Sequence, residues 1–130
     1  MYKFIVKEDC DLRDCEKFDP ATWLLFVNSI LFCKRNNVEF RVTSLIGDRA
    51  NVKAISTTHS DGRAFDISHR SEGGWTDVLR NKFAFELNRD FVDIGAISYS
   101  DQRSRPCILK NDHFHIQVRR NANINKFIKE

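Results

Sequence analysis

Two stretches of the chain have the hydrophobic spacing of a helix that covers a core. In the first, steps of three and four place five large apolar residues on one helical face: Trp23, Phe26, Val27, Ile30 and Leu31. Asp19 and Pro20 precede them, and aspartate is a favoured N-cap while proline is tolerated at the first helical position. The basic, turn-prone run at 34–37 would end this helix. We therefore expect a helix that begins at residue 20 and covers the core.

A second helix is predicted over residues 75–89, after a loop at 71–74 that contains two glycines. Most of the apolar residues of this stretch fall on one helical face, which also includes two charged residues. The face comprises Trp75, Val78, Leu79, Lys82, Phe83 and Glu86.

Alternation of apolar and polar residues predicts strands beside these helices. Residues 2–6 alternate weakly, residues 38–43 alternate clearly, and residues 92–97 alternate again. The stretches at 47–58 and 100–106 are expected to be loops. The polar tail after Arg120 is expected to form a short terminal helix or to fray.

The last predicted strand separates histidines from large apolar residues. Side chains alternate along a strand, so one face carries three apolar residues: Phe114, Ile116 and Val118. The other face carries three polar ones: His113, His115 and Gln117. We expect the apolar face to meet the core and both histidines to point to the open side of the sheet.

These elements predict a single domain over residues 1–130, of α+β class, with a small antiparallel sheet and flanking helices. A chain of 130 residues can bury an ordinary core without metal or disulfides. Its 42% of hydrophobic and 30% of charged residues are close to globular averages, which argues against disorder.

Charge and hydropathy exclude several classes of partner. The net charge is only +3, and the basic residues are scattered, with Arg119-Arg120 as the densest late patch, so no nucleic-acid partner is expected. The longest apolar runs are too short for a transmembrane helix, and no membrane partner is expected. The charged N-terminus does not fit a signal peptide, so we expect the chain to be made in the cytoplasm.

The four cysteines do not form a recognisable framework. Cys10, Cys15, Cys33 and Cys107 lack the paired spacings of a structural zinc site. We expect reduced, partly buried thiols, and a disulfide between two of them stays open as an alternative.

Two separated stretches together hold the side chains of a catalytic zinc site. His59 and Asp66 flank Gly62, which with its short neighbours predicts a tight turn between them. Asp112 and His115 begin the last strand. Two imidazoles and a carboxylate can hold zinc with one position open to water, and a spare carboxylate can move that water's proton. Each residue alone has an ordinary loop, turn or cap interpretation, and we place His69 in a solvated loop.

The motif formed by these residues resembles the signature of a known family. Thr57-x-His59-x-x-Gly62-x-Ala64-x-Asp66, followed by Asp112-x-x-His115, is similar to the zinc-binding signature of the D-alanyl-D-alanine carboxypeptidase and L-alanyl-D-glutamate endopeptidase family (peptidase M15-like). That family includes small bacteriophage endolysins, and it shares its fold with the Hedgehog signalling domain. The resemblance implies a Hedgehog/DD-peptidase-like fold.

The resemblance also assigns roles to individual residues. His59, Asp66 and His115 would be the ligands of Zn²⁺. Asp112 would be the general base and acid, and His113 would lie beside the substrate or the oxyanion.

An arginine that contacts the substrate is expected shortly after Thr43-Ser44. In this chain the first arginine after that pair is Arg49, displaced by four residues. Arg49 is therefore the candidate, and Arg41 and Arg63 are its rivals.

The implied activity is that of a zinc metallopeptidase that degrades the bacterial cell wall. The hydrolase would cleave an amide bond in the peptidoglycan stem peptide, L-alanyl-D-glutamate being the expected bond, and an aspartate at position 112 favours the phage endolysin branch. The alternatives are a D-alanyl-D-alanine carboxypeptidase, a metal-dependent nuclease, and a non-catalytic zinc-stabilised wall-binding or virion domain. We expect a monomer that reaches the wall through a holin or on lysis.

Overall fold

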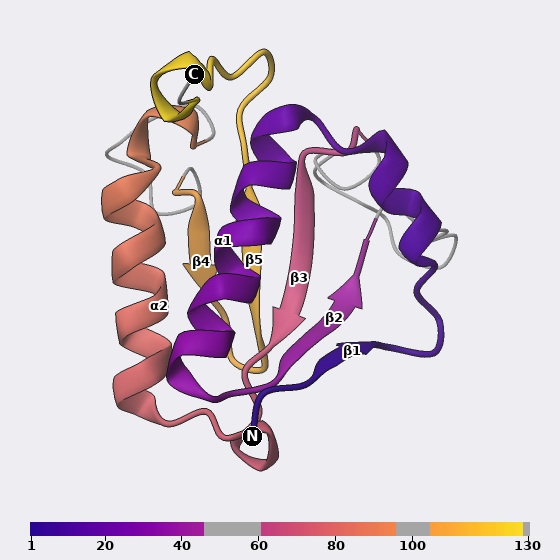
Figure 1. Cartoon of the computed structure of the whole chain (residues 1–130), viewed down its shortest axis with the longest axis vertical. Coiled ribbons are helices and arrows are strands. Elements are labelled where there is room, and N and C mark those ends of the chain that lie inside the picture. Colours follow the sequence, from indigo (N-terminus) through magenta and orange to yellow (C-terminus); the bar gives the residue numbers. More distant parts are fainter. Residues whose placement is uncertain (46–60, 96–104, 129–130) are drawn as a thin grey trace.

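The computed structural model describes residues 1–45, 61–95 and 105–128, and in these residues five strands form one sheet. The strands are β1 (Phe4–Val6), β2 (Phe40–Ser44), β3 (Ala64–Ser68), β4 (Cys107–Leu109) and β5 (His113–Gln117). Their spatial order is β1-β2-β3-β5-β4 (Figure 1). The two strands β3 and β5, far apart in the sequence, are thus neighbours at the centre of the sheet.

The expectation of a wholly antiparallel sheet is wrong at one edge, where the sheet contains a parallel pair and is therefore mixed. The pairs β2–β3, β3–β5 and β4–β5 are antiparallel, whereas β1 and β2 are parallel. The chain between β1 and β2 passes through a helix, and such a crossover returns it in its original direction. The α+β class itself is confirmed.

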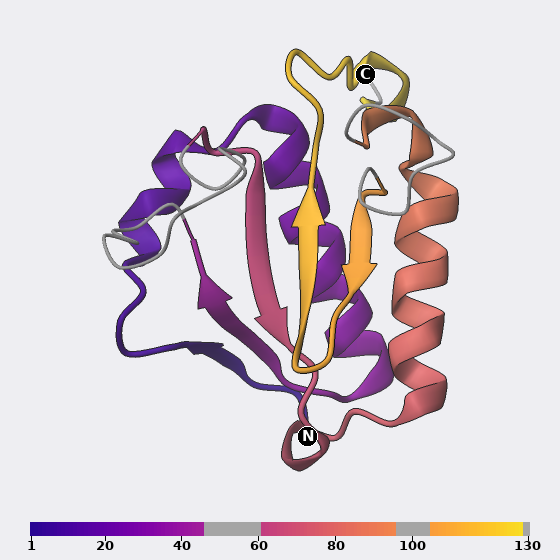
Figure 2. The same ribbon diagram turned by 180° about the vertical axis from the view of Figure 1, so that it is seen from behind.

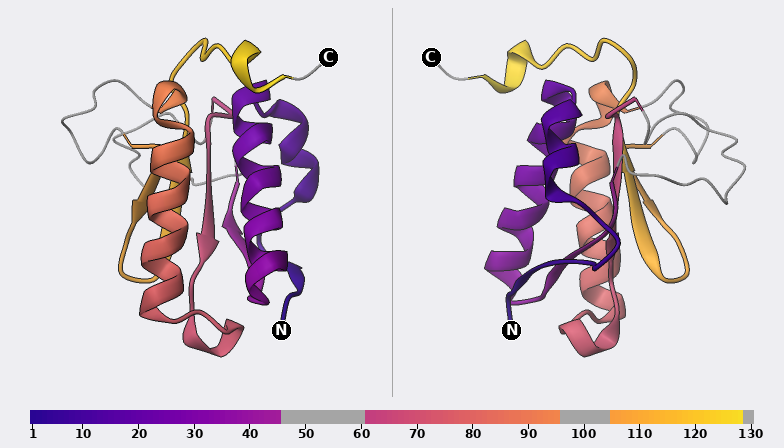
Figure 3. Two further views of the ribbon diagram at one scale, coloured as in Figure 1. Left: turned by 60° about the vertical axis from the view of Figure 1, so that its left-hand side comes forward. Right: turned by 90° about the vertical axis from the view of Figure 1, so that its right-hand side faces the viewer.

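Both long helices pack on the same face of the sheet. These are α1 (Pro20–Asn36) and α2 (Asp77–Asp90), and the right-hand view of Figure 3 shows both on one side of the sheet. In Figure 1, α1 lies in front of the strands and α2 lies beside β4. Figure 2 shows the opposite face, which neither α1 nor α2 covers. Side chains on that second face are available to build a site.

The ends of α1 agree with the sequence prediction. Pro20 is the first helical residue and Asp19 is at the N-cap position, although the Asp19 side chain makes no capping hydrogen bond. At the other end, Asn37 adopts the left-handed conformation with φ 56°, and its N–H donates to the carbonyl oxygens of Cys33 and Lys34. Asparagine tolerates this conformation better than most residues.

The predicted inner face of α1 is correct at Phe26, which is buried, and at Ile30, which packs against the core, but it is wrong at its other three positions. Trp23, Val27 and Leu31 are 41–46% exposed, whereas Leu25 and Phe32 are buried. The helix is apolar around most of its circumference, so two overlapping stripes satisfy the helical spacing. The stripe that packs on the sheet also contains small residues, which allow the helix to approach closely.

The helix α2 is capped by Thr76, whose hydroxyl accepts the Leu79 N–H. Phe83 is buried and packs in an aromatic cluster with Trp75 and Phe114, with ring centroids 4.5–5.6 Å apart. The predicted face is therefore correct at its centre. It is wrong at Val78, which is 76% exposed in the first turn.

The strand predicted at 92–97 is wrong over its described part. Val92–Ile94 is a 3-10 helix, in which the Ile94 N–H donates to the Phe91 carbonyl. Phe91 and Ile94 are both buried, and a spacing of three places them on one side of a 3-10 helix. The strands β3 and β4 and the 3-10 helix Leu12–Lys17 were not predicted, whereas the 3-10 helix Asn125–Phe127 agrees with the short terminal helix expected after Arg120.

The four cysteines are free thiols, and Cys15, Cys33 and Cys107 are buried. Burial raises the pKa of the Cys33 thiol to about 12 and that of Cys15 to about 11. The expected reduced, partly buried state is confirmed, and the disulfide alternative is not realised. Among the described helices, none is long and apolar enough to cross a membrane.

Candidate functional site

The register of β3 and β5 sets Asp66 directly opposite His115. The same register pairs Ser68 with His113 and Ala64 with Gln117. Phe65, Ile67, Phe114 and Ile116, which alternate with these residues, are fully buried on the helix side. Because side chains alternate along a strand, the polar ones share the opposite face of the sheet, the face that Figure 2 shows to be free of the two helices.

Gly62 sets the turn that leads into β3. Its φ of +73° is unfavourable for other residues, and a Cβ atom there would lie 2.0 Å from the Lys17 carbonyl oxygen. The Gly62 carbonyl accepts hydrogen bonds from the Asp19 N–H at 3.1 Å and the Thr22 hydroxyl at 2.8 Å. The predicted turn thus exists, and its glycine fixes β3 to the start of α1.

Asp66 and His115 are in direct contact. The Asp66 Oδ1 atom lies 2.9 Å from His115 Nδ1, and the side chains are only 10% and 14% exposed. Two ligand atoms on one tetrahedral zinc ion are separated by about 3.3 Å, given bonds of roughly 2.0–2.1 Å. The two side chains are therefore spaced closely enough to share a metal ion after a small adjustment.

The second nitrogen of His115 supports this interpretation. His115 Nε2 lies 3.0 Å from the Gln117 Oε1 atom, and the Gln117 amide group donates its own N–H to the Arg105 carbonyl at 3.3 Å. Nε2 therefore donates to Gln117, and a neutral ring has no second N–H for Asp66. The lone pair of Nδ1 then faces the Asp66 carboxylate, and a metal ion held between these two groups would suit both of them. The Gln117 amide would orient a ligating imidazole.

The third predicted ligand, His59, lies outside the described residues, as do Thr57 and Arg49. Across the ranges that the structure describes, no three histidine, cysteine or acidic side chains converge on one metal position. Asp66 and His115 are thus the part of the predicted set whose arrangement is defined, and their donor atoms fit zinc.

Asp112 and His113 form a second contact on the same face. The His113 Nδ1–H donates to Asp112 Oδ1 at 2.5 Å, and His113 Nε2 lies 3.8 Å from Asp66 Oδ2. The hydrogen bond from His113 and the charge of that imidazole lower the pKa of the Asp112 carboxyl. The His113 ring lies between two carboxylates, and the Asp112 side chain is 88% exposed.

A hollow of about 460 Å³ adjoins these side chains, and we call it the central cleft. Its lining combines three cationic side chains, two carboxylates, three hydroxyl groups and one imidazole. They are Lys7, Arg41, Thr43, Ser44, Asp66, Ser68, Arg70, Asp112 and His113. The cationic and hydroxyl groups of this lining can donate hydrogen bonds to the carboxylates of a ligand.

Two of the arginines are held by one buried acid. Glu39, whose side chain is 5% exposed, accepts hydrogen bonds from Arg41 Nε at 3.0 Å and from Arg70 Nε at 2.6 Å. Its other oxygen accepts from Arg70 Nη2 at 3.0 Å. Burial raises the pKa of the Glu39 carboxyl, but these hydrogen bonds outweigh it and the net shift is downward. Glu39, Arg41 and Arg70 together carry one net positive charge beside the cleft.

Two of the three candidate arginines lie in the described residues. Arg41 lines the central cleft. Arg63 is buried and donates to the Val118 carbonyl at 3.1 Å and to Asp61 at 3.1 Å, so it fixes the turn before β3. Sequence reasoning missed Arg70 and Glu39, because their contact joins residues 31 positions apart.

The solvated position expected for His69 is wrong. His69 is 6% exposed, its Nε2 lies 2.7 Å from the Lys110 carbonyl oxygen, and its ring meets Phe114 edge-on. The polar neighbours of His69 in the sequence gave no sign of this burial, since the hairpin that covers it follows forty residues later.

Comparison of the chain with protein-family models, with characterised proteins and with solved structures finds no match.

Proposed function

We propose that this protein is a zinc-dependent peptidoglycan peptidase that cleaves an amide bond in the stem peptide of the cell wall. The observation that carries the proposal is the pairing of Asp66 with His115 across β3 and β5, with Asp112 and His113 on the same face. This is one oxygen ligand, one nitrogen ligand and a separate acid beside them, and a hydrolytic zinc site needs each of these.

Zinc would be held by Asp66, His115 and His59, and it would supply a Lewis acid and a bound water of lowered pKa. Gln117 would keep the Nδ1 atom of His115 free for the metal by accepting the N–H at Nε2. The burial of Asp66 and His115 strengthens their interaction with a cation, because water screens it less.

Asp112 would act as the proton carrier of the reaction. The Asp112 carboxyl is ionised at neutral pH, and its exposed oxygens are able to accept a proton from the attacking water and deliver it to the leaving amine. The Nδ1–H of His113 donates to the Asp112 carboxylate. The His113 ring lies between Asp112 and Asp66, where it would contact the reacting amide.

The central cleft supports a substrate rich in carboxylates, as stem peptides are. Arg41 is our candidate for the arginine that contacts the substrate, because it lines the cleft beside Asp66. Arg70 and Lys7 add positive charge to the same wall. An L-alanyl-D-glutamate bond places a carboxylate next to the scissile amide, which suits this arrangement.

Purified peptidoglycan of defined composition tests the proposal. We expect the zinc-loaded protein to release fragments whose masses locate the cut between L-alanine and D-glutamate, and we expect a chelator to stop their release. Release of terminal D-alanine alone would indicate a carboxypeptidase. Binding of wall fragments without cleavage would contradict the proposed activity and indicate a binding domain.

A further inference from the structure

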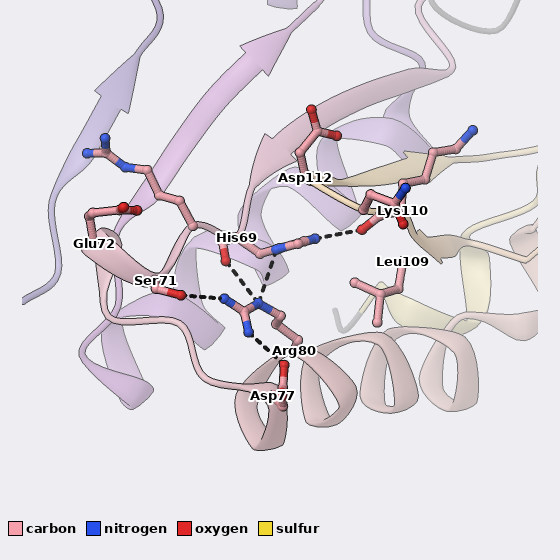
Figure 4. A pocket seen from close by; sticks show the side chains of 10 residues that line it. His69, Ser71, Glu72, Asp77, Arg80, Leu109, Lys110 and Asp112 are labelled. Carbon is pink, nitrogen blue, oxygen red and sulfur yellow. Dashed lines mark hydrogen bonds and ion pairs between the residues drawn. The ribbon is translucent and has the colours of Figure 1, made fainter.

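We propose that His69 and Arg80 are positioning residues that hold the turn carrying Asp112 in place for catalysis. The inference rests on the proposed function, because it assigns a role toward the acid of that site. Neither residue belongs to the motif, and His69 was expected in solvent. Both lie beside the hairpin turn between β4 and β5 (Figure 4).

The hydrogen bonds of His69 fix both the orientation and the tautomer of its ring. Arg80 Nε lies 3.1 Å from His69 Nδ1, and a guanidinium can only donate. Nδ1 is therefore the acceptor, so the ring hydrogen of the neutral imidazole is on Nε2. That N–H donates to the Lys110 carbonyl oxygen at 2.7 Å, as the dashed lines of Figure 4 show.

Arg80 is itself held by several neighbours. It donates to the His69 carbonyl at 3.0 Å, to Asp77 at 2.8 Å and to the Ser71 hydroxyl at 3.1 Å. Its side chain is only 16% exposed. Arg80 thus joins the segment after β3 to the first turn of α2, and it gives His69 a rigid support.

The group that His69 holds is the backbone of the Asp112 turn. The Lys110 N–H donates to the His113 carbonyl at 2.9 Å and closes the hairpin, with Asp112 inside the turn. The Asp112 side chain is 88% exposed, so apart from its hydrogen bond with His113 little restrains it, and the backbone of the turn sets the position of both residues. The bond from His69 to Lys110 therefore links the position of Asp112 to β3, the strand that carries Asp66.

The same contacts surround a hollow of about 580 Å³ between residues 69–72, the first turn of α2 and residues 109–112. The turn is thus not packed from this side, and the hydrogen bond from His69 to the Lys110 carbonyl ties it to the segment after β3. A misplacement of about 1 Å in a catalytic group can lower the rate about 100-fold.

The hydrogen bonds can be tested directly by NMR on the wild-type protein. We expect the ¹⁵N shifts of His69 to show a protonated Nε2 and an unprotonated Nδ1, and we expect slow exchange of the Lys110 amide hydrogen. In His69→Phe that exchange should become faster. A protonated Nδ1 in the neutral ring, or unchanged exchange in the variant, would overturn the proposal.

The catalytic consequence needs a matched set of variants. His69→Phe keeps the ring contact with Phe114 but removes both ring hydrogen bonds, and we expect kcat to fall by roughly 10- to 100-fold while KM and bound zinc stay unchanged. His69→Gln retains a donor and an acceptor and should restore most of kcat. Asn88→Ala is the control, since Asn88 ties Cys107 at the far end of β4 to α2 through two hydrogen bonds.

A His69→Phe protein that keeps wild-type kcat, or an equal loss of kcat in Asn88→Ala, would show that His69 contributes only to stability and would overturn the proposal. Failure of the proposed function is a separate result. If the wild-type protein cuts no wall fragment, the peptidase assignment fails, while the NMR measurements still decide whether His69 holds the turn.

Discussion

A single buried carboxylate, Glu39, holds two of the arginines that line the central cleft. Arg41 and Arg70 each donate to it, so their guanidinium groups are oriented before any ligand arrives. An ion pair of this kind is costly to form in the interior, but removing one partner leaves the other charges without compensation. At the residue scale, Glu39 therefore connects the stability of the start of β2 with the charge of the cleft.

Glu39→Gln should lower the free energy of unfolding by about 2 kcal/mol at pH 7, because hydrogen bonds to a charged group are lost. The pKa of Glu39 is lower in the folded protein than its ordinary value of 4.5. Its contribution is therefore complete above that value and is lost as the pH falls through the lower, folded pKa. Urea unfolding between pH 7 and pH 2 should show a shallower acid-side decline for the variant, and parallel curves would contradict the role of Glu39.

Arg41→Ala should weaken substrate binding more than it slows chemistry. Loss of a hydrogen bond to a substrate carboxylate costs roughly 1.5–3 kcal/mol, which corresponds to a rise in KM of about 10-fold or more. Steady-state kinetics on a soluble stem peptide would measure this. Arg13→Ala is a matched control, because Arg13 is 85% exposed and pairs with Asp11 away from the cleft. A KM unchanged in Arg41→Ala would assign the substrate contact to another residue.

At the scale of elements, α1 shows what hydrophobic spacing can and cannot predict. Its start at Pro20 and its end at Asn37 follow from local chemistry, since a proline, a basic last turn and a left-handed asparagine act within a few residues. The buried face of α1 cannot be predicted in this way, because Leu25 and Leu31 are equally apolar. Which of the two is buried depends on how the helix packs on the sheet. The strand β5 was predictable because its two faces differ sharply in polarity.

A pair of leucine substitutions checks which face of α1 is buried. Leu25 is fully buried and Leu31 is 44% exposed. Leu25→Ala should lower the free energy of unfolding by about 2–5 kcal/mol, and Leu31→Ala should lower it by less than about 1 kcal/mol. Denaturant unfolding of the two variants measures the difference. Equal losses would contradict the packing of α1 described above.

At the scale of the whole molecule, the hydrophobic core and the candidate site lie on opposite faces of the sheet. Both long helices cover one face, and the candidate site lies on the other, divided between β3 and β5 (Figures 2 and 3). The sequence could predict the α+β class and the candidate residues Asp66, Asp112 and His115. It could not predict the parallel pairing of β1, because this depends on the crossover through α1. Nor could it predict β3, since a strand buried along its whole length and containing Asp66 and Ser68 lacks the usual apolar pattern.

The most direct test of the central claim compares bound zinc and wall hydrolysis in Asp112→Asn, His115→Ala and the wild-type protein. Asp112 is assigned to proton transfer and His115 to metal binding, so the two variants should fail in different ways. We expect Asp112→Asn to retain one zinc ion and to lose hydrolysis by about 100-fold or more, and His115→Ala to lose both zinc and hydrolysis. Undiminished hydrolysis in Asp112→Asn, or undiminished zinc binding in His115→Ala, would contradict the account.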